Sequence, residues 1–239
     1  MPDFMIDTHC HILPNIDDGP TDDEESVEMA NIAANDGITG IIATPHIYDN
    51  RFSMDDIAAG VDRLNRLLSA QNIPVEVHPG AEVAIGLDPH ALCKYTISGT
   101  SYILIEFPHD HLPAHAGQLI QWLSARKLKP IIAHPERNYS LIRSPEALLP
   151  LLTKNVYVQI TAGSITGDFG RDIAYCANFL LDSGKVDLIA SDAHSSRGRR
   201  PLLSPAAKTV RDRLGKAVSE RLVRKNPESV LAGMEIHVD

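Results

Sequence analysis

The chain has 239 residues, 44% of them hydrophobic and 22% charged, a composition typical of a globular protein with a large buried core. Its net charge of −9 does not suit nucleic-acid binding, and no apolar run approaches the length of a membrane span. The three cysteines have neither redox nor metal-binding spacing, which fits a reducing compartment. We therefore expect a cytoplasmic protein that is not inserted in a membrane.

Strand-like and helix-like segments alternate along the chain, and no linker, repeat or low-complexity stretch divides it. Runs rich in Ile, Val, Leu and Ala predict strands of a parallel sheet covered on both faces. We expect these strands at residues 4–9, 40–44, 75–78, 102–107, 129–133, 156–161 and 186–191. The pattern predicts one α/β domain over residues 1–239, with seven βα units forming a barrel slightly smaller than the eightfold one.

Helix signals fall between the predicted strands. A capping box at Thr21 to Glu24 begins the first helix, and Gly37 is its expected end. Ser53 and Asp56 open a second helix, which has apolar residues at helical spacing as far as Leu68. Further helices are expected at 114–126, 145–153, 169–183 and 203–222, with a short turn after residue 227.

Residues that can bind metal follow nearly every predicted strand. His9 and His11 leave the first strand two residues apart, so both point to the same side. Since the strand ends of a parallel barrel meet at one mouth, the other candidates should converge with them. These are Asp17 or Asp18, His46, Glu82, Glu106, His134, Asp192 and His194. Only the sixth strand, ending in Thr161, carries no candidate ligand.

Five imidazoles and four carboxylates at one mouth indicate a polynuclear metal site, and their number suits three divalent ions. Without thiolate ligands, manganese, iron, zinc, cobalt or magnesium would fit. Such a site can hydrolyse a phosphate monoester through metal-activated hydroxide, with arginine holding the phosphate. The sequence has no Cys-x5-Arg loop, and Cys10 should point away from His9 and His11, so no cysteine phosphoenzyme is expected.

The order of these motifs resembles a known family. HCH at residue 9, DDGP at 17, TPH at 44, PGAE at 79, IEFP at 105, HPER at 134 and SDAH at 191 are similar to the PHP (polymerase and histidinol phosphatase) superfamily. The nearest branch is the metal-dependent protein-tyrosine phosphatases of bacterial capsule and exopolysaccharide synthesis. The resemblance covers residues 5–233. It implies a distorted (β/α)7 TIM-like barrel with three metals, manganese favoured, that hydrolyses phosphotyrosine on an autophosphorylated bacterial tyrosine kinase.

The resemblance also implies roles for single residues. The first metal would be held by His9, His11, Glu82 and Asp192, the second by Glu82, Glu106 and His134, and the third by Asp18, His46 and His194. Asp18 is favoured over Asp17. Arg137 and Arg199 match phosphate-binding positions, with Arg197 and Arg200 as alternatives to Arg199. His194 or a metal-bound water would help to protonate the leaving group, and the roles of His109 and His111 stay open.

Two other functions remain open from the sequence. A small-molecule phosphatase, acting for example on histidinol phosphate, would use the same metal centre. A protein of another class, a metal-stabilised regulator that binds a kinase without catalysis, would be expected to have lost some ligands. The sequence does not exclude a homo-oligomer.

Overall fold

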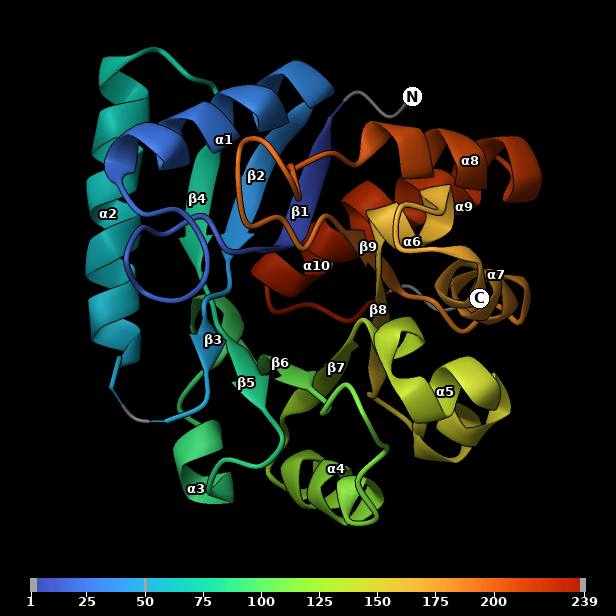
Figure 1. The fold of residues 1–239 in the computed structure, drawn as a ribbon. Coiled ribbons are helices and arrows are strands. Elements are labelled where there is room, and N and C mark those ends of the chain that lie inside the picture. The colour runs from blue at the N-terminus through green and yellow to red at the C-terminus, as the bar shows by residue number, and fades with distance from the viewer. Residues whose placement is uncertain (1–3, 50, 237–239) are drawn as a thin grey trace.

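Residues 4–49 and 51–236 are described by the computed structural model, in which parallel strands form a distorted ring (Figure 1). One sheet has the order β1-β2-β4 and the other the order β3-β5-β6-β7-β8-β9. The strands are β1 (Met5–Cys10), β2 (Ile38–Ala43), β3 (His46–Ile47), β4 (Glu76–Pro79), β5 (Glu82–Ala84), β6 (Tyr102–Glu106), β7 (Lys129–Ala133), β8 (Tyr157–Thr161) and β9 (Leu188–Ala190).

Two of the seven expected strands are each broken into two pieces, and this break separates the sheets. Pro45, which has no N–H for a ladder, lies between β2 and β3. Gly80 follows β4, where a Cβ atom would lie 2.7 Å from the side chain of Ile42. On the other side of the ring, a single parallel bridge joins Cys10 to Ala193, beyond β9. The expected barrel with seven strand positions is confirmed, in a distorted form without a continuous ladder.

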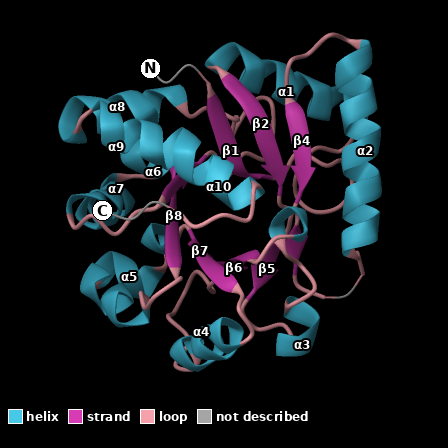
Figure 2. Cartoon of the chain, turned by 180° about the vertical axis from the view of Figure 1, so that it is seen from behind, coloured by secondary structure: helices cyan, strands magenta, loops and turns pink. Residues whose placement is uncertain are grey.

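Helices surround the ring (Figures 1 and 2). The α-helices are α1 (Asp23–Asp36), α2 (Met54–Ala70), α3 (Pro89–Leu92), α4 (Ala116–Ala125), α5 (Tyr139–Arg143), α6 (Ala162–Thr166), α7 (Arg171–Asp182), α8 (Ser204–Leu214), α9 (Lys216–Glu220) and α10 (Asn226–Leu231). Shorter 3₁₀ segments are η1 (Ile97–Gly99), η2 (Pro135–Arg137) and η3 (Pro145–Leu151), and η4 (Arg221–Lys225) is a π-helix. Among the described residues, no helix combines the length and apolar character needed to cross a bilayer.

The predicted helix ends are partly correct. Gly37 ends α1 in the left-handed conformation, and Ser53 forms a capping box with Asp56 at the start of α2. The box expected at Thr21 is wrong by one position, because Asp22 caps α1 by accepting from the backbone of residue 25. The segment 203–222 divides at Gly215 into α8 and α9, with η4 following them.

The buried apolar residues form two clusters. The larger one includes apolar side chains from the strands and from the surrounding helices α1, α2, α4, α7 and α8. The smaller one combines side chains of five strands, such as Ile42, Leu104, Ile131 and Leu188, with Val230 of α10. Figure 2, the view from the back of the molecule, shows α10 lying across the ring of strands on the side toward the viewer. This packing leaves the carboxyl ends of the strands free to carry polar side chains.

Candidate metal centre

The first group of convergent ligands gathers where β1 ends. The Nε2 atoms of His9 and His11 lie 3.0 Å apart. Glu82 Oε2 lies 3.2 and 3.4 Å from these two nitrogens, and Asp192 Oδ1 lies 3.4 and 3.5 Å from them. All four side chains are buried. The spacing is that of donor atoms around a single cation, and the alternation expected for His9 and His11 accounts for their part in it.

A second group surrounds the other side of Glu82. His134 Nε2 lies 2.7 Å from Glu82 Oε1 and 4.0 Å from Glu106 Oε1. His46 Nδ1 lies 2.9 Å from Glu82 Oε2 and 3.6 Å from Glu106 Oε2. Glu82 Oε1 faces His134 while Oε2 faces both His46 and the first group, so Glu82 is placed to bridge two cations.

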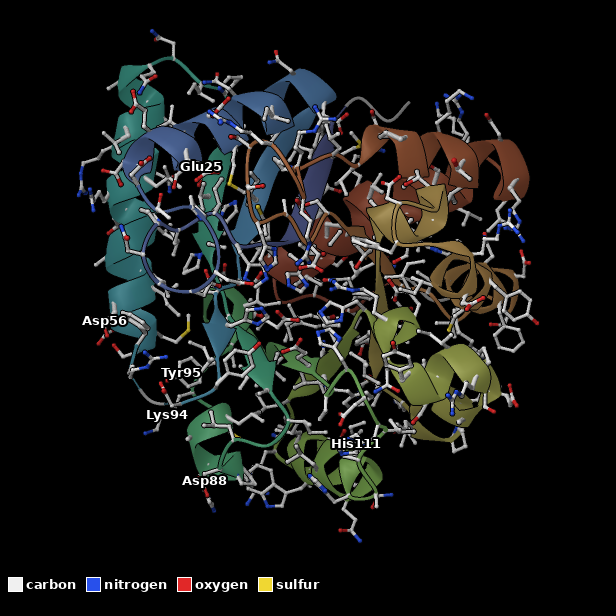
Figure 3. All side chains as sticks on the ribbon, viewed as in Figure 1. Glu25, Asp56, Asp88, Lys94, Tyr95 and His111 are labelled. Carbon is white, nitrogen blue, oxygen red and sulfur yellow. The ribbon has the colours of Figure 1, made fainter. Side chains whose placement is uncertain are left out.

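The third group lies at the mouth of the ring. Asp18 Oδ1 is 3.3 Å from His194 Nε2 and 3.7 Å from His46 Nε2. The rings of His11 and His194 lie with centroids 3.8 Å apart, tilted by 31°, which joins this group to the first. Asp18 is the exposed member, with 66% of its side chain accessible. Figure 3 shows nitrogen and oxygen atoms crowding the middle of the molecule, between the strand ends. The structure thus brings together all nine residues expected at the mouth.

Backbone strain accompanies two of these residues. His134 has φ 30° and Asp192 has φ 53°, in the left-handed region that residues with a Cβ atom seldom adopt. His134 immediately follows β7, and Asp192 lies two residues after the end of β9. Strain of this kind is concentrated at functional sites, where surrounding packing holds it in place.

Three residues support the candidate ligands, two by contacting an imidazole and one by holding the segment before Asp192. Asp17 Oδ2 lies 2.6 Å from His11 Nδ1 and accepts from the backbone N–H of His46 at 2.9 Å. The side-chain amide of Gln159, on β8, lies 2.9 Å from His9 Nδ1. Asp7 is buried and accepts hydrogen bonds from both the backbone N–H and the hydroxyl of Ser191, the residue before Asp192. Gln159 lies on the strand that sequence reasoning left empty, because an amide is not a usual metal ligand.

The surroundings shift the pKa values of two carboxyl groups of the cluster in opposite directions. Burial and the neighbouring Glu82 raise the pKa of Glu106 to about 7. Burial also opposes ionisation of Glu82, yet the adjacent His9 and His134 hold its pKa well below its usual range. His46 Nδ1 and Glu82 Oε2 are only 2.9 Å apart, but neither buried atom has a hydrogen-bond partner within the described part of the chain. A cation between such donor atoms would satisfy them, so the residues fit divalent metal.

Both predicted arginines reach Asp192. One guanidinium nitrogen of Arg137 and one of Arg199 bond to Oδ2, the oxygen turned away from His9 and His11. The Arg137 guanidinium also lies over the ring of Phe169, 5.1 Å from its centroid. Arg199 is half-buried, whereas Arg197 and Arg200 are exposed. The structure therefore distinguishes Arg199 from its two neighbours, as one of the paired guanidinium groups beside the ligand cluster.

The remaining candidates have simpler surroundings. Cys10 is fully buried in the larger core cluster, and burial raises the pKa of its thiol well above the ordinary value. His109 Nε2 is 3.7 Å from Glu106, while His111 pairs with Asp110. Tyr48, which sequence reasoning missed, stacks on His46 with centroids 5.0 Å apart. Only its aromatic ring two residues after a candidate ligand could have drawn attention to it.

The distorted α/β barrel and its crowded mouth define the class of protein, one with clustered His, Asp and Glu side chains at its strand ends that could hold metal. The family model for capsular polysaccharide synthesis, CpsB/CapC, matches residues 5–232. The chain belongs to this family, and the resemblance read from the motifs is confirmed.

Curated relatives and a solved structure agree with that placement. The chain is 41% identical to the tyrosine-protein phosphatase YwqE of Bacillus subtilis over 201 residues, 82% of this chain and 79% of YwqE. It is 35% identical to CapC of Staphylococcus aureus over 243 residues, 97% of this chain and 93% of CapC. A crystal structure from work on YwqE and Streptococcus pneumoniae CpsB, described as metal-dependent tyrosine phosphatases, superposes with a TM-score of 0.92. The superposition has 36% identity and covers 98% of this chain and 97% of that one.

Proposed function

We propose that the protein is a metal-dependent protein-tyrosine phosphatase. Its substrate is phosphotyrosine on an autophosphorylated bacterial tyrosine kinase of capsule or exopolysaccharide synthesis. The observation that carries the proposal is the juxtaposition of three ligand groups with two guanidinium groups at one barrel mouth. The names of the relatives, tyrosine phosphatases in Bacillus and Streptococcus, support the choice of phosphotyrosine among phosphate esters.

The nine convergent residues would hold three divalent ions, for which we propose manganese, with iron, zinc, cobalt or magnesium as alternatives. His9, His11, Glu82 and Asp192 form the first site, and Glu82, Glu106 and His134 the second. Asp18, His46 and His194 form the third. His46 Nδ1 also faces the second site, so its ring is placed between the two.

When bound, the ions would supply positive charge for the phosphoryl oxygens and would lower the pKa of water, so that hydroxide is available to attack phosphorus near neutral pH. The protein's own contribution is to bind and orient the ester. Arg137 and Arg199 present N–H groups beside Asp192, and a guanidinium binds two phosphate oxygens at once. Packing of Arg137 against Phe169 holds that group in place.

His194 suits a ligand rather than a proton donor. Burial, together with the neighbouring His11 and Arg199, lowers its pKa to about 3, so its ring is neutral near pH 7. A neutral imidazole offers a lone pair to a metal but has no proton to give from that nitrogen. The phenolate of tyrosine, with an ordinary pKa near 10, needs only modest assistance in leaving. We therefore propose a ligand role alone for His194.

We also propose that residues 1–239 form a single domain and that the protein is cytoplasmic. One large core cluster runs from Met5 to Val223, and the three cysteines are free, as they would be in a reducing compartment. The kinase tail that carries phosphotyrosine would be the partner.

The test compares substrates on the metal-loaded protein. Turnover of a phosphotyrosine peptide well above that of histidinol phosphate supports the proposal, and the reverse preference would assign a small-molecule phosphatase instead. Absence of turnover with either substrate, together with tight binding of the phosphorylated kinase tail, would indicate the non-catalytic regulator. The complete set of ligands argues against that last function, since a regulator has no need of them.

A further inference from the structure

An apolar pocket opens directly beside the metal centre. It has a volume of about 290 Å³, and its walls come from the segment after β3, the end of β5 and the loop after β6. The side chains of Tyr48, Ile85, Phe107 and Pro108 make it apolar, with Glu106 at its inner side. Ile85 and Phe107 are buried, so this wall is firm, while Tyr48 is 60% exposed at its edge. A large aromatic side chain left exposed in this way marks a contact surface.

The pocket and the metal centre share a wall. Glu106 lines the pocket, and its carboxylate also faces His46 and His134. The hydroxyl of Tyr48 donates to Glu106 at 3.4 Å, and its ring is stacked on that of His46, tilted by 24°. A group bonded to a phosphate at the metal centre can therefore enter the pocket without crossing solvent.

A second pocket adjoins the centre on the side of the arginines. It measures about 420 Å³, and the charged residues Arg199, Arg200 and Asp168 line it together with apolar ones such as Phe169 and Leu202. Its charged groups of both signs can bind a peptide backbone and polar side chains, which the apolar side chains of the first pocket cannot. The two pockets therefore offer different chemistry, one beside Glu106 and the other beside Arg199.

From this arrangement we infer that the pocket formed by Tyr48, Ile85, Phe107 and Pro108 binds the phenyl ring of the phosphotyrosine side chain. This inference rests on the proposed function, and it explains why the enzyme would prefer aryl phosphates. Tyr48 and Phe107 offer ring surfaces for offset or edge-to-face contact with the substrate ring. Phosphoserine carries no ring, so it reaches the metals but leaves the pocket unfilled.

Substitution of Gly86 provides a way to fill the pocket without replacing any candidate metal ligand. Gly86 lines the pocket, and a Cβ atom added there would meet no atom within 4 Å. The series Gly86→Ala, Gly86→Val and Gly86→Leu should therefore fold and progressively occupy the space. Thr166→Leu is the matched control, because Thr166 is exposed and lines the second pocket.

The readout is competitive inhibition of phosphotyrosine-peptide hydrolysis by benzylphosphonate and by inorganic phosphate, on metal-loaded protein. Wild type should bind benzylphosphonate more tightly than phosphate. Along the Gly86 series this advantage should fall by about tenfold or more, the size of lost contacts in an apolar pocket. Inhibition by phosphate and the metal content should stay unchanged, and Thr166→Leu should keep the wild-type ratio of the two inhibition constants.

Two results would overturn the inference, and a third separates it from the proposed function. An undiminished benzylphosphonate advantage in Gly86→Leu would show that the ring lies elsewhere. Loss of the benzylphosphonate advantage in Thr166→Leu alone would place the ring in the second pocket, beside Arg199. Wild type that fails to hydrolyse the phosphotyrosine peptide would overturn the proposed function as well, whereas the first two results leave that function standing.

Discussion

The Nδ1 atom of His11 lies 2.6 Å from Oδ2 of Asp17, a contact that separates the roles of two adjacent acidic residues. Although burial opposes it, the hydrogen bond from His11 lowers the pKa of Asp17 to about 2, so its carboxylate stays ionised. The same side chain also accepts from the backbone N–H groups of Gly19 and His46. Asp17 is therefore committed to orienting His11, and Asp18 is left to face the third ligand group.

Substitution of these two aspartates should give different defects. Asp18→Asn should lower the number of metal ions bound at saturation, because it removes a ligand from the mouth. Asp17→Asn should keep that number but weaken metal affinity by about 10- to 100-fold, the usual effect of losing a partner that orients a ligand. Elemental analysis of each protein across a metal titration measures both. The assignment would be wrong if Asp17→Asn lost an ion at saturation and Asp18→Asn did not.

Gln159 should act on His9 in a comparable way. When His9 binds metal through Nε2, its Nδ1 carries a proton. Rotating the Gln159 amide by 180° places its oxygen, instead of its nitrogen, where it accepts a hydrogen bond from that proton. Gln159→Leu removes the acceptor and should weaken metal affinity by about tenfold or more. Gln159→Glu keeps an acceptor and should retain affinity near that of wild type. Equal metal affinities in the leucine and glutamate variants would show that the contact has no such role.

Arg137 and Arg199 should be needed for phosphate and not for metal. Each change to alanine should lower kcat/KM by about 100-fold or more, in line with the loss of a donor that stabilises developing charge. Inhibition by free phosphate should weaken in both variants. Arg→Lys should recover little, because lysine keeps the charge without the two-pronged contact.

The controls for these variants lie in the same loop. Arg197→Ala should be close to wild type in kcat/KM, since its side chain is exposed, and Arg200→Ala, in the wall of the pocket beside Arg199, should keep wild-type inhibition by free phosphate. Metal stoichiometry should be unchanged in all four alanine variants. A silent Arg199→Ala beside a defective Arg197→Ala or Arg200→Ala would move the phosphate contact to that neighbour. Loss of metal in Arg137→Ala would instead make Arg137 a supporting residue of the Asp192 site.

Cys10 should be dispensable for turnover. Its side chain is fully buried and its pKa is raised well above the ordinary value, so it is not available as a thiolate. Cys10→Ala should retain most activity, and thiol alkylation of the native protein should have little effect. Steady-state kinetics on the variant and on alkylated wild type provide the measurement. Strong inhibition by alkylation, lost in Cys10→Ala, would indicate a thiol mechanism.

The ligand cluster was predictable because two simple geometric rules govern it. Alternation along a strand places His9 and His11 on one side, and the shared mouth of a parallel barrel gathers residues from strands far apart in sequence. Those rules carry no information on the contacts that support a ligand. Gln159 and Asp17 each form a hydrogen bond to a histidine on another segment. Only the folded chain determines how those segments lie against each other.

The backbone departed from expectation where local preferences compete. Thr21 and Asp22 can both cap a helix, and which one does so depends on where the preceding loop leaves the chain. The breaks after Ala43 and after Pro79 divide two strands at Pro45 and Gly80, which the apolar pattern alone does not locate. Segment 145–153 forms the 3₁₀ helix η3, with Pro150 inside it, because proline lacks the N–H that an α-helix needs.

Metal removal and return test the central claim most directly, with turnover of a phosphotyrosine peptide followed alongside the number of bound ions. Chelation should abolish turnover, and adding Mn²⁺ should restore it in step with ions bound, to three per chain. His9→Ala and Asp192→Ala, which each remove a ligand of the first site, should remain folded and inactive under the same additions. Undiminished turnover in protein shown to be free of metal would contradict the account.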